Sequence, residues 1–97
     1  MATPNEQLSA ALRTLEEKID QLCLNAEDLT MQASALRVMR NRAAEAVSTD
    51  QPFSSVVKSL RDLSAAVGTY SSVHAKAADS LSKVIDHEQR LREVANG

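Results

Sequence analysis

The chain has 97 residues, of which 43% are hydrophobic and only 2% aromatic, and its formal net charge is −2. One domain is the default for this length, and the charge provides no overall basic field for nucleic acid. With only two glycines and two prolines among many Ala, Leu, Glu and Lys residues, the composition indicates long helices.

The sequence carries no constellation typical of an enzyme or a metal site. Cys23 is the single cysteine, so an intramolecular disulfide is excluded, and we expect a small buried hydrophobe there. His74 and His87 lie 13 residues apart on different helix faces and form no metal pair. No glycine-rich loop and no nucleophile beside a base are found. We therefore expect neither catalysis nor a cofactor.

The segment Met1–Glu6 lacks the basic and apolar regions of a signal peptide, and no apolar run approaches 18 residues. These features favour a cytoplasmic protein without a transmembrane segment. Secretion without a signal peptide would leave the same sequence.

The first helix is predicted over about residues 4–47. Thr3 and Glu6 have the spacing of a capping box, and Pro4 suits a first helical position. Apolar residues then recur at alternating intervals of four and three, which is the pattern of a coiled-coil seam. The nine positions are Leu8, Leu12, Leu15, Ile19, Leu22, Ala26, Leu29, Ala33 and Leu36. Arg40 occupies the next position and interrupts the repeat.

A turn is predicted at about residues 48–52, where Ser48, Thr49 and Asp50 favour caps and Pro52 suits the start of a new helix. A second helix over about residues 53–95 carries a longer seam. Its members are Phe53, Val56, Leu60, Leu63, Val67, Tyr70, His74, Ala77, Leu81, Val84, Glu88, Leu91 and Ala95.

A corner of a few residues makes the two helices antiparallel neighbours. The predicted fold is therefore all-α: a single hairpin domain over residues 1–97, in which residue i faces about residue 100 − i. A lone hairpin buries little area per residue, so we expect a partner to complete a four-helix or larger bundle.

Additional apolar residues flank the second seam and make its apolar face wider than a two-stranded coil requires. We take them as candidates for the partner interface: Val57, Val73, Ala78 and Ile85.

Basic residues gather on both sides of the predicted turn. They are Arg37, Arg40, Arg42, Lys58 and Arg61. One interpretation is a basic tip that contacts an anionic membrane or partner; the other is a solvated helix end whose cations suit the helix dipole. No aromatic residues are interleaved to suggest nucleic acid.

Two further positions have open interpretations. Gly68, in the middle of the second helix, marks either a bend, a close contact or a tolerated surface irregularity. Glu88 either pairs with a basic group of a partner helix or reaches water.

In outline the chain resembles three families of helical proteins, with clear departures from each. Small WXG-type secretion substrates are hairpins of similar length, but this chain lacks Trp-x-Gly at the corner, and Tyr70 is followed four residues later by His74 instead of an acidic residue. Type III needle subunits carry two prolines around the turn, whereas Pro52 stands alone. BAR-type domains share long heptad arms but need three long helices.

These observations predict a non-enzymatic interaction module, a coiled-coil assembly or scaffold subunit whose partners are other helical chains or a second copy. The alternative is a small hairpin of a secretion system, either a WXG-like or needle-like subunit or its chaperone. A third class, a module that binds anionic membranes, depends on the basic tip alone.

Overall fold

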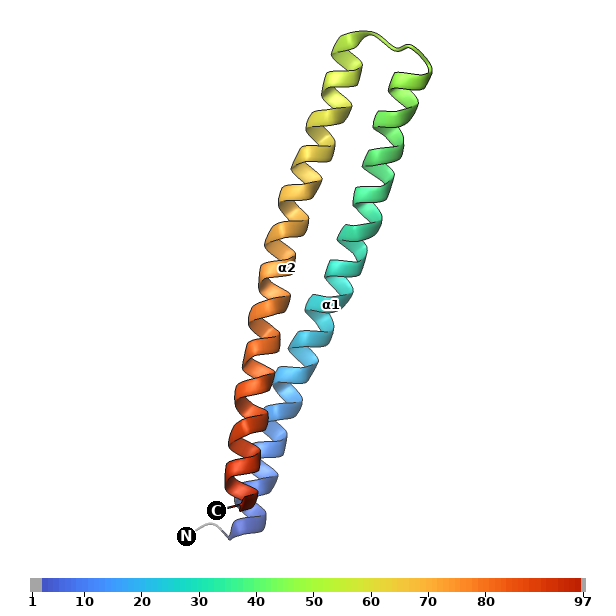
Figure 1. The fold of residues 1–97 in the computed structure, drawn as a ribbon. Helices are drawn as coiled ribbons and strands as arrows, with labels where there is room; N and C mark the ends of the chain where they lie inside the picture. Colours follow the sequence, from blue (N-terminus) through green and yellow to red (C-terminus); the bar gives the residue numbers. More distant parts are fainter. Residues whose placement is uncertain (1–2, 97) are drawn as a thin grey trace. The chain divides into compact units, whose positions relative to one another are not determined.

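The computed structural model describes residues 3–96 and contains two helices, α1 (Pro4–Ser48) and α2 (Phe53–Asn96), shown in Figure 1. The structure is 95% helical and has no strands among the described residues. The prediction of an all-α chain made of two long helices is confirmed. Met1, Ala2 and Gly97 belong to the expected domain range and lie outside the described residues.

The start of α1 is the capping box that its sequence predicts. The backbone N–H of Glu6 donates to the Thr3 hydroxyl oxygen at 3.2 Å, and the N–H of Thr3 donates to the Glu6 carboxylate at 3.4 Å. These two bonds satisfy backbone donors that have no partner within the helix. Both side chains are exposed, so the cap acts locally and needs no tertiary contact.

The corner between the helices is a Schellman motif. The N–H of Gln51 donates to the Ala46 carbonyl at 3.1 Å, and the N–H of Asp50 donates to the Val47 carbonyl at 3.2 Å. Asp50 has a φ of 53°, the left-handed conformation that glycine usually supplies at this position. After it, the Pro52 carbonyl accepts bonds from Ser55 and Val56 in the first turn of α2.

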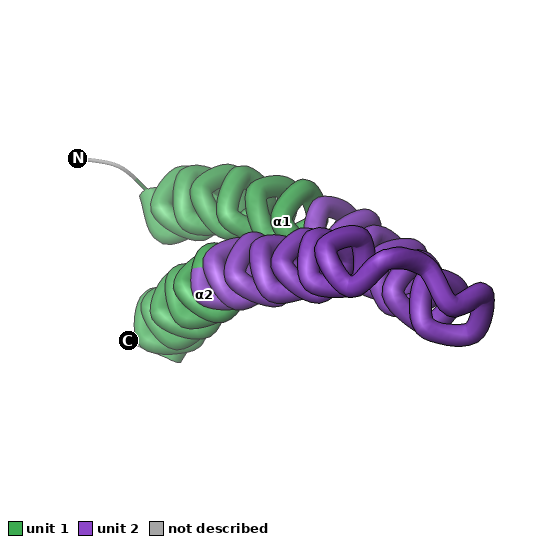
Figure 2. Tube along the Cα trace, turned by 90° about the horizontal axis from the view of Figure 1, so that it is seen from above, with its two compact units in different colours: residues 1–26, 76–97 green, residues 27–75 purple. Residues whose placement is uncertain are grey.

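The chain divides into two compact units, coloured separately in Figure 2. Unit 1 combines the first part of α1, up to Ala26, with the last part of α2, from Lys76 onward. Unit 2 spans Glu27–Ala75 and contains the corner. Each unit is a pair of antiparallel helical segments, as the short corner requires. The expectation of one domain stays a prediction.

The described residues include very few that are buried. They are Ala43, Ala46, Val73 and Ser80. None of the large apolar side chains described is fully buried, and twelve are exposed. The helices therefore leave many large apolar side chains uncovered.

Candidate interaction face

In unit 2 the two helices touch through an inner face that includes small residues. Ala43 and Ala46 of α1 and Val73 of α2 are buried there, with Val73 only 7% exposed. The half-buried residues around them follow the same alternation of three and four. They are Leu29, Gln32, Leu36 and Met39 on α1, and Val56, Ser59, Leu63, Ala66 and Tyr70 on α2.

In unit 1 the inner face continues the same two repeats but contains polar groups. Ser80 is buried, and the side-chain amide of Asn25 donates a hydrogen bond to its hydroxyl oxygen. This bond satisfies a polar group that would otherwise be costly to bury. The other members are half-buried: Leu8, Ala11, Leu15, Lys18 and Leu22 on α1, and Ala77, Val84, His87 and Leu91 on α2.

The structure divides the residues of the predicted seam into two groups. One group lies on the inner face: Leu8, Leu15, Leu22, Leu29, Leu36, Leu63, Tyr70, Val84 and Leu91. The other group is exposed and does not line the contact between the helices: Leu12, Ile19, Leu60, Val67 and Leu81. For these five residues the expected packing against the other helix is corrected. Residues three positions after each inner-face member, such as Ala11, Val73 and Ser80, make the contact instead.

The exposed residues form a second stripe beside the inner face on each helix, which we call the outer stripe. Leu12 and Ile19 follow the inner-face residues Leu8 and Leu15 by four positions, and Leu60 follows Val56 by four. The complete outer stripe consists of Leu12, Ile19, Ala26 and Ala33 on α1, and Phe53, Leu60, Val67, His74 and Leu81 on α2. All nine are exposed.

Within each unit, the outer stripes of the two helices lie on the same side of the contact. Four residues advance a helix by slightly more than one turn, so each outer-stripe residue is rotated from its inner-face neighbour by the same angle. Because the helices are antiparallel and face each other, equal rotations carry both stripes to one side. The consequence is an apolar surface two helices wide.

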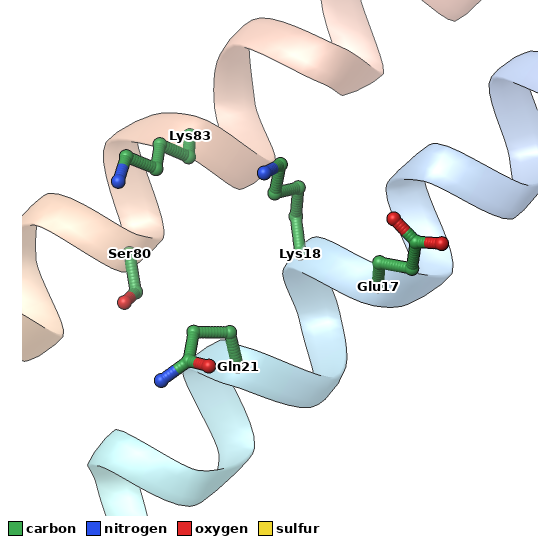
Figure 3. A pocket seen from close by; sticks show the side chains of 5 residues that line it. All are labelled: Glu17, Lys18, Gln21, Ser80 and Lys83. Carbon is green, nitrogen blue, oxygen red and sulfur yellow. The ribbon is translucent and has the colours of Figure 1, made fainter.

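The opposite side of unit 1 is polar, which agrees with this geometry. Residues that precede inner-face members by one position, such as Gln21 on α1 and Lys83 on α2, line one shallow depression of about 160 Å³. Figure 3 shows the side chains that line it: Glu17, Lys18 and Gln21 from α1, and Ser80 and Lys83 from α2. Residues that lie the same number of positions from an inner-face member on the two helices are therefore on one side of the contact, which is here the polar side.

The four interface candidates occupy different surroundings. Val73 is buried in unit 2, so the expectation that it flanks the seam uncovered is corrected: it packs inside the helix pair. Val57 is half-buried, whereas Ala78 and Ile85 are exposed. These last three lie one position after inner-face residues and border the outer stripe of α2. They widen the apolar surface on that helix.

The predicted basic tip lies entirely in unit 2, and all five of its side chains are exposed. Among residues 3–96 none of the five forms an ion pair, and Arg40 donates one hydrogen bond to the Asn41 side chain at 3.3 Å. Unit 2 also contains five acidic residues, so its formal net charge is zero: Glu27, Asp28, Glu45, Asp50 and Asp62. The arrangement is that of solvated cations spread around two helices.

Four further residues, Cys23, His74, Glu88 and Gly68, lie in different surroundings. Cys23 is exposed, so the expectation of a buried hydrophobe at this position is wrong. His74 is exposed and stacks on Tyr70, with ring centroids 6.4 Å apart. Glu88 is half-buried and forms an ion pair with Arg92 at 2.9 Å. Gly68 has open space where a side chain would stand, which removes the close-contact interpretation.

Neither a metal-binding cluster nor a membrane span is found among the described residues. No group of three or more His, Cys, Asp or Glu side chains in residues 3–96 could hold a metal ion. Within the described residues, neither α1 nor α2 contains an apolar stretch long enough to cross a membrane.

Sequence reasoning missed the inner-face role of Ser59, Ala66 and Ser80, because small and polar residues do not stand out in an apolar repeat. Their spacing from Val56, Leu63 and Ala77 is the only signal, since each lies three positions later.

Comparison with protein-family models, with curated proteins and with solved structures found no match to this chain.

Proposed function

We propose that this chain is a non-enzymatic helical interaction module, a coiled-coil subunit that assembles with other helical chains. The observation that carries the proposal is the position of its large apolar residues. Alanine, serine and valine occupy the buried positions, while Leu12, Leu60 and Val67 are each at least half exposed. A surface of this kind supports a role in assembly because isolated soluble proteins seldom leave a long apolar stripe in water.

The free energy available from covering the outer stripe is substantial. Full burial of one Leu, Ile or Val side chain contributes roughly 1.5–3 kcal/mol, so burying the exposed half contributes about 1 kcal/mol. The large aliphatic members are Leu12, Ile19, Leu60, Val67 and Leu81. Together they would contribute roughly 5 kcal/mol, which is comparable to the net stability of a small domain.

The pattern of the stripe indicates the class of partner. Its residues recur every seven positions beside the inner face, which is the spacing at which a third or fourth helix packs against a helical pair. Val57, Ala78 and Ile85 extend the apolar width on α2. A helical chain therefore suits this surface better than a flat or extended partner.

A catalytic role has little to support it. The hydroxyl of Ser80 is buried and accepts a hydrogen bond from an amide, so it faces no base that would activate it. Cys23 is exposed and lies on α1 away from the inner face. The proposal accordingly assigns the function to a surface and not to a reactive group.

The test compares two double variants of the tagged chain, expressed in the cells from which the sequence comes. Leu60→Lys with Leu81→Lys places charges on the outer stripe, while Ser54→Lys with Ser82→Lys places the same charges on the outermost side of α2. We expect the parent and the serine variant to migrate in extracts as part of a larger complex, and the leucine variant to lose it while staying helical. A parent chain that migrates as a single copy would contradict the proposal.

A further inference from the structure

The outer stripe ends in one charged residue on each helix, and the two have opposite charges. Arg40 follows Ala33 by seven positions on α1, and Glu88 follows Leu81 by seven positions on α2. Arg40 belongs to unit 2 and is exposed, while Glu88 belongs to unit 1 and is half-buried. The apolar surface of each unit therefore carries one charge of its own, positive in unit 2 and negative in unit 1.

In unit 1, residues that line one depression show which positions of α1 and α2 lie level with each other, that is, at the same height along the helix pair. Ala10, Thr14, His87 and Arg90 line one such depression, so residues 10–14 lie level with residues 87–90. Leu12 is therefore level with Glu88. By the same reasoning, residues 17–21 lie level with residues 80–83. Ile19 is therefore level with Leu81.

In unit 2 the levels follow from the corner, because the helices run antiparallel from it. Counting equal distances from the corner at residues 49–52 places Arg40 level with Leu60 and Ala33 level with Val67. Unit 1 thus presents a layer of two large residues, Ile19 and Leu81, whereas the matching layer of unit 2 contains the small Ala33.

We propose that the partner is a second copy of this chain, with unit 1 of each copy docked on unit 2 of the other through the outer stripe. This inference rests on the proposed function and names its partner. In the docked pair, α1 lies antiparallel over α1 of the second copy, and α2 lies antiparallel over α2 of the second copy. Four helical segments then surround each apolar layer.

Side-chain size supports this pairing. Ile19 of one copy lies over Ala33 of the second copy, so a large residue fills the space that a small one leaves. Leu81 lies over Val67, which gives a second apolar contact in the same layer. Pairing like units would instead collect Ile19 and Leu81 of both copies in one layer and Ala33 and Val67 of both copies in another, so large residues would crowd one layer and small ones would underfill the other.

Charge supports the same pairing. When unit 1 docks on unit 2, Glu88 of one copy enters the layer that contains Arg40 and Leu60 of the second copy. Opposite charges then share a layer whose other members are apolar. Docking like units would bring two Glu88 carboxylates into one layer and two Arg40 guanidinium groups into another, which costs free energy. Glu88 can keep its ion pair with Arg92, because a carboxylate has two oxygens.

The exposed area is sufficient for a stable pair of copies. The chain exposes 7211 Å². A globular monomer of this length exposes about 5,400 Å², so the excess is about 1,800 Å² per chain. A standard interface buries about 800 Å² per partner, and permanent homodimers bury more. The excess therefore matches what a permanent homodimer removes from water.

The test is a charge exchange followed by sedimentation equilibrium of the full chain at low ionic strength, where ion pairs are least screened. We expect the parent to be a dimer. Arg40→Glu and Glu88→Arg should each raise the dimer dissociation constant at least tenfold, and the double variant should restore it. The matched controls are Arg42→Glu and Glu93→Arg, which make the same charge changes on exposed positions outside the outer stripe.

Each outcome of this experiment decides the inference. A monomeric parent overturns it, and if that parent still migrates in a larger complex in extracts, the proposed function stands with a different partner. Single variants that weaken the dimer no more than their controls overturn the pairing of Arg40 with Glu88. A double variant that stays dissociated does the same.

A disulfide experiment tests the direction of docking independently. With Cys23 replaced by Ser, chains carrying Ile19→Cys are mixed with chains carrying Ala33→Cys and oxidised gently. We expect the mixed disulfide between the two kinds of chain to dominate, because a disulfide needs Cα atoms within about 7 Å. Predominance of disulfides between two Ile19→Cys chains would overturn the docking of unit 1 on unit 2, because only docking of like units brings the two Ile19 positions into one layer.

Discussion

The buried positions of the inner face and the outer stripe differ in a way opposite to that of most soluble proteins. The inner face, which joins α1 to α2, buries Ala43, Ala46 and Ser80. The outer stripe, which faces water, contains Leu12 at 53% exposure and Leu60 at 51%. Soluble proteins usually bury leucine far more often than serine. The few buried positions thus hold small residues, leucines such as Leu15 and Leu63 are half-buried beside them, and several other large residues stay exposed.

This contrast indicates how the chain divides its apolar residues between two tasks. Small side chains on the inner face let two helices approach closely, but they contribute little free energy per residue. The large side chains of the outer stripe, such as Leu12, Leu60 and Val67, remain available for a contact that is not within the hairpin. The proposed partner would therefore add to the stability that each unit gains from its own helix pair, and variants on the two surfaces should behave differently.

The largest effect is expected from Val73→Asp, which breaks the inner face of unit 2. Val73 is 7% exposed, and a charge in its place has no partner in the contact between the helices. We expect a loss of about 3 kcal/mol or more in the free energy of unfolding. Circular dichroism during thermal melting measures it, with Ser72→Asp as the exposed neighbour. Equal melting temperatures for the two variants would show that Val73 is not in the contact.

A smaller effect is expected from the polar pair on the inner face of unit 1. Asn25→Ala leaves the buried Ser80 hydroxyl without its donor and should cost about 1–3 kcal/mol. Adding Ser80→Ala should recover much of that loss, because no unsatisfied polar group then remains. Urea unfolding of the two single variants and the double variant gives the coupling free energy. A coupling near zero would mean that the hydrogen bond contributes nothing to the contact.

The sequence predicts the helices and the corner well because their signals are local. Thr3 and Glu6 form the predicted capping box, and both helices end within one residue of the expected positions. The predicted turn, at about residues 48–52, begins one residue too early, because Ser48 is still helical. Helix ends of this kind depend on neighbouring residues, so the pattern of caps and turn formers is enough to locate them.

The sequence does not reveal which apolar stripe faces the other helix. Leu15 belongs to two overlapping heptad frames: one continues to Ile19, and the other continues to Lys18. Apolar character favours the first frame, whereas the structure buries the second more deeply. The reason is that a sequence pattern records which residues avoid water, and both the other helix and a separate partner can provide that shelter. Only the arrangement of the helices in the structure distinguishes residues that face the other helix from residues that are free to face a separate partner.

A gain in stability of about 1 kcal/mol is expected from Gly68→Ala, outside both surfaces. Gly68 is exposed in the middle of α2, and an added Cβ meets no atom within 4 Å. Alanine has the higher helix propensity by about this amount. Chemical unfolding should show the gain with no change in oligomeric mass, which would separate helix stability from assembly. A loss of stability would indicate that Gly68 supports a bend or a contact.

The smallest effect is expected at the corner, from Asp50→Gly. Asp50 adopts a φ of 53°, which costs free energy for any residue with a Cβ. Glycine removes that cost but has more freedom in the unfolded chain, so we expect a net gain of about 0.5 kcal/mol. Asp50→Ala should instead lose stability, because alanine has no side-chain oxygen to stabilise the left-handed conformation. Urea midpoints that rank alanine above glycine would contradict this explanation of the corner.

The central claim, that a partner covers the outer stripe, is tested most directly by measuring the accessibility of Val67 in the assembled protein. In a chain with Cys23 replaced by Ser, Val67→Cys puts a small reactive thiol on the stripe, and Ser82→Cys puts one on the outermost side of α2. Both positions are exposed when the chain is alone. In native extract we expect a thiol reagent to modify the Val67→Cys chain at least tenfold more slowly than the Ser82→Cys chain, and equally fast after denaturation. Equal rates in the native extract would show that the stripe stays in water and would contradict the account.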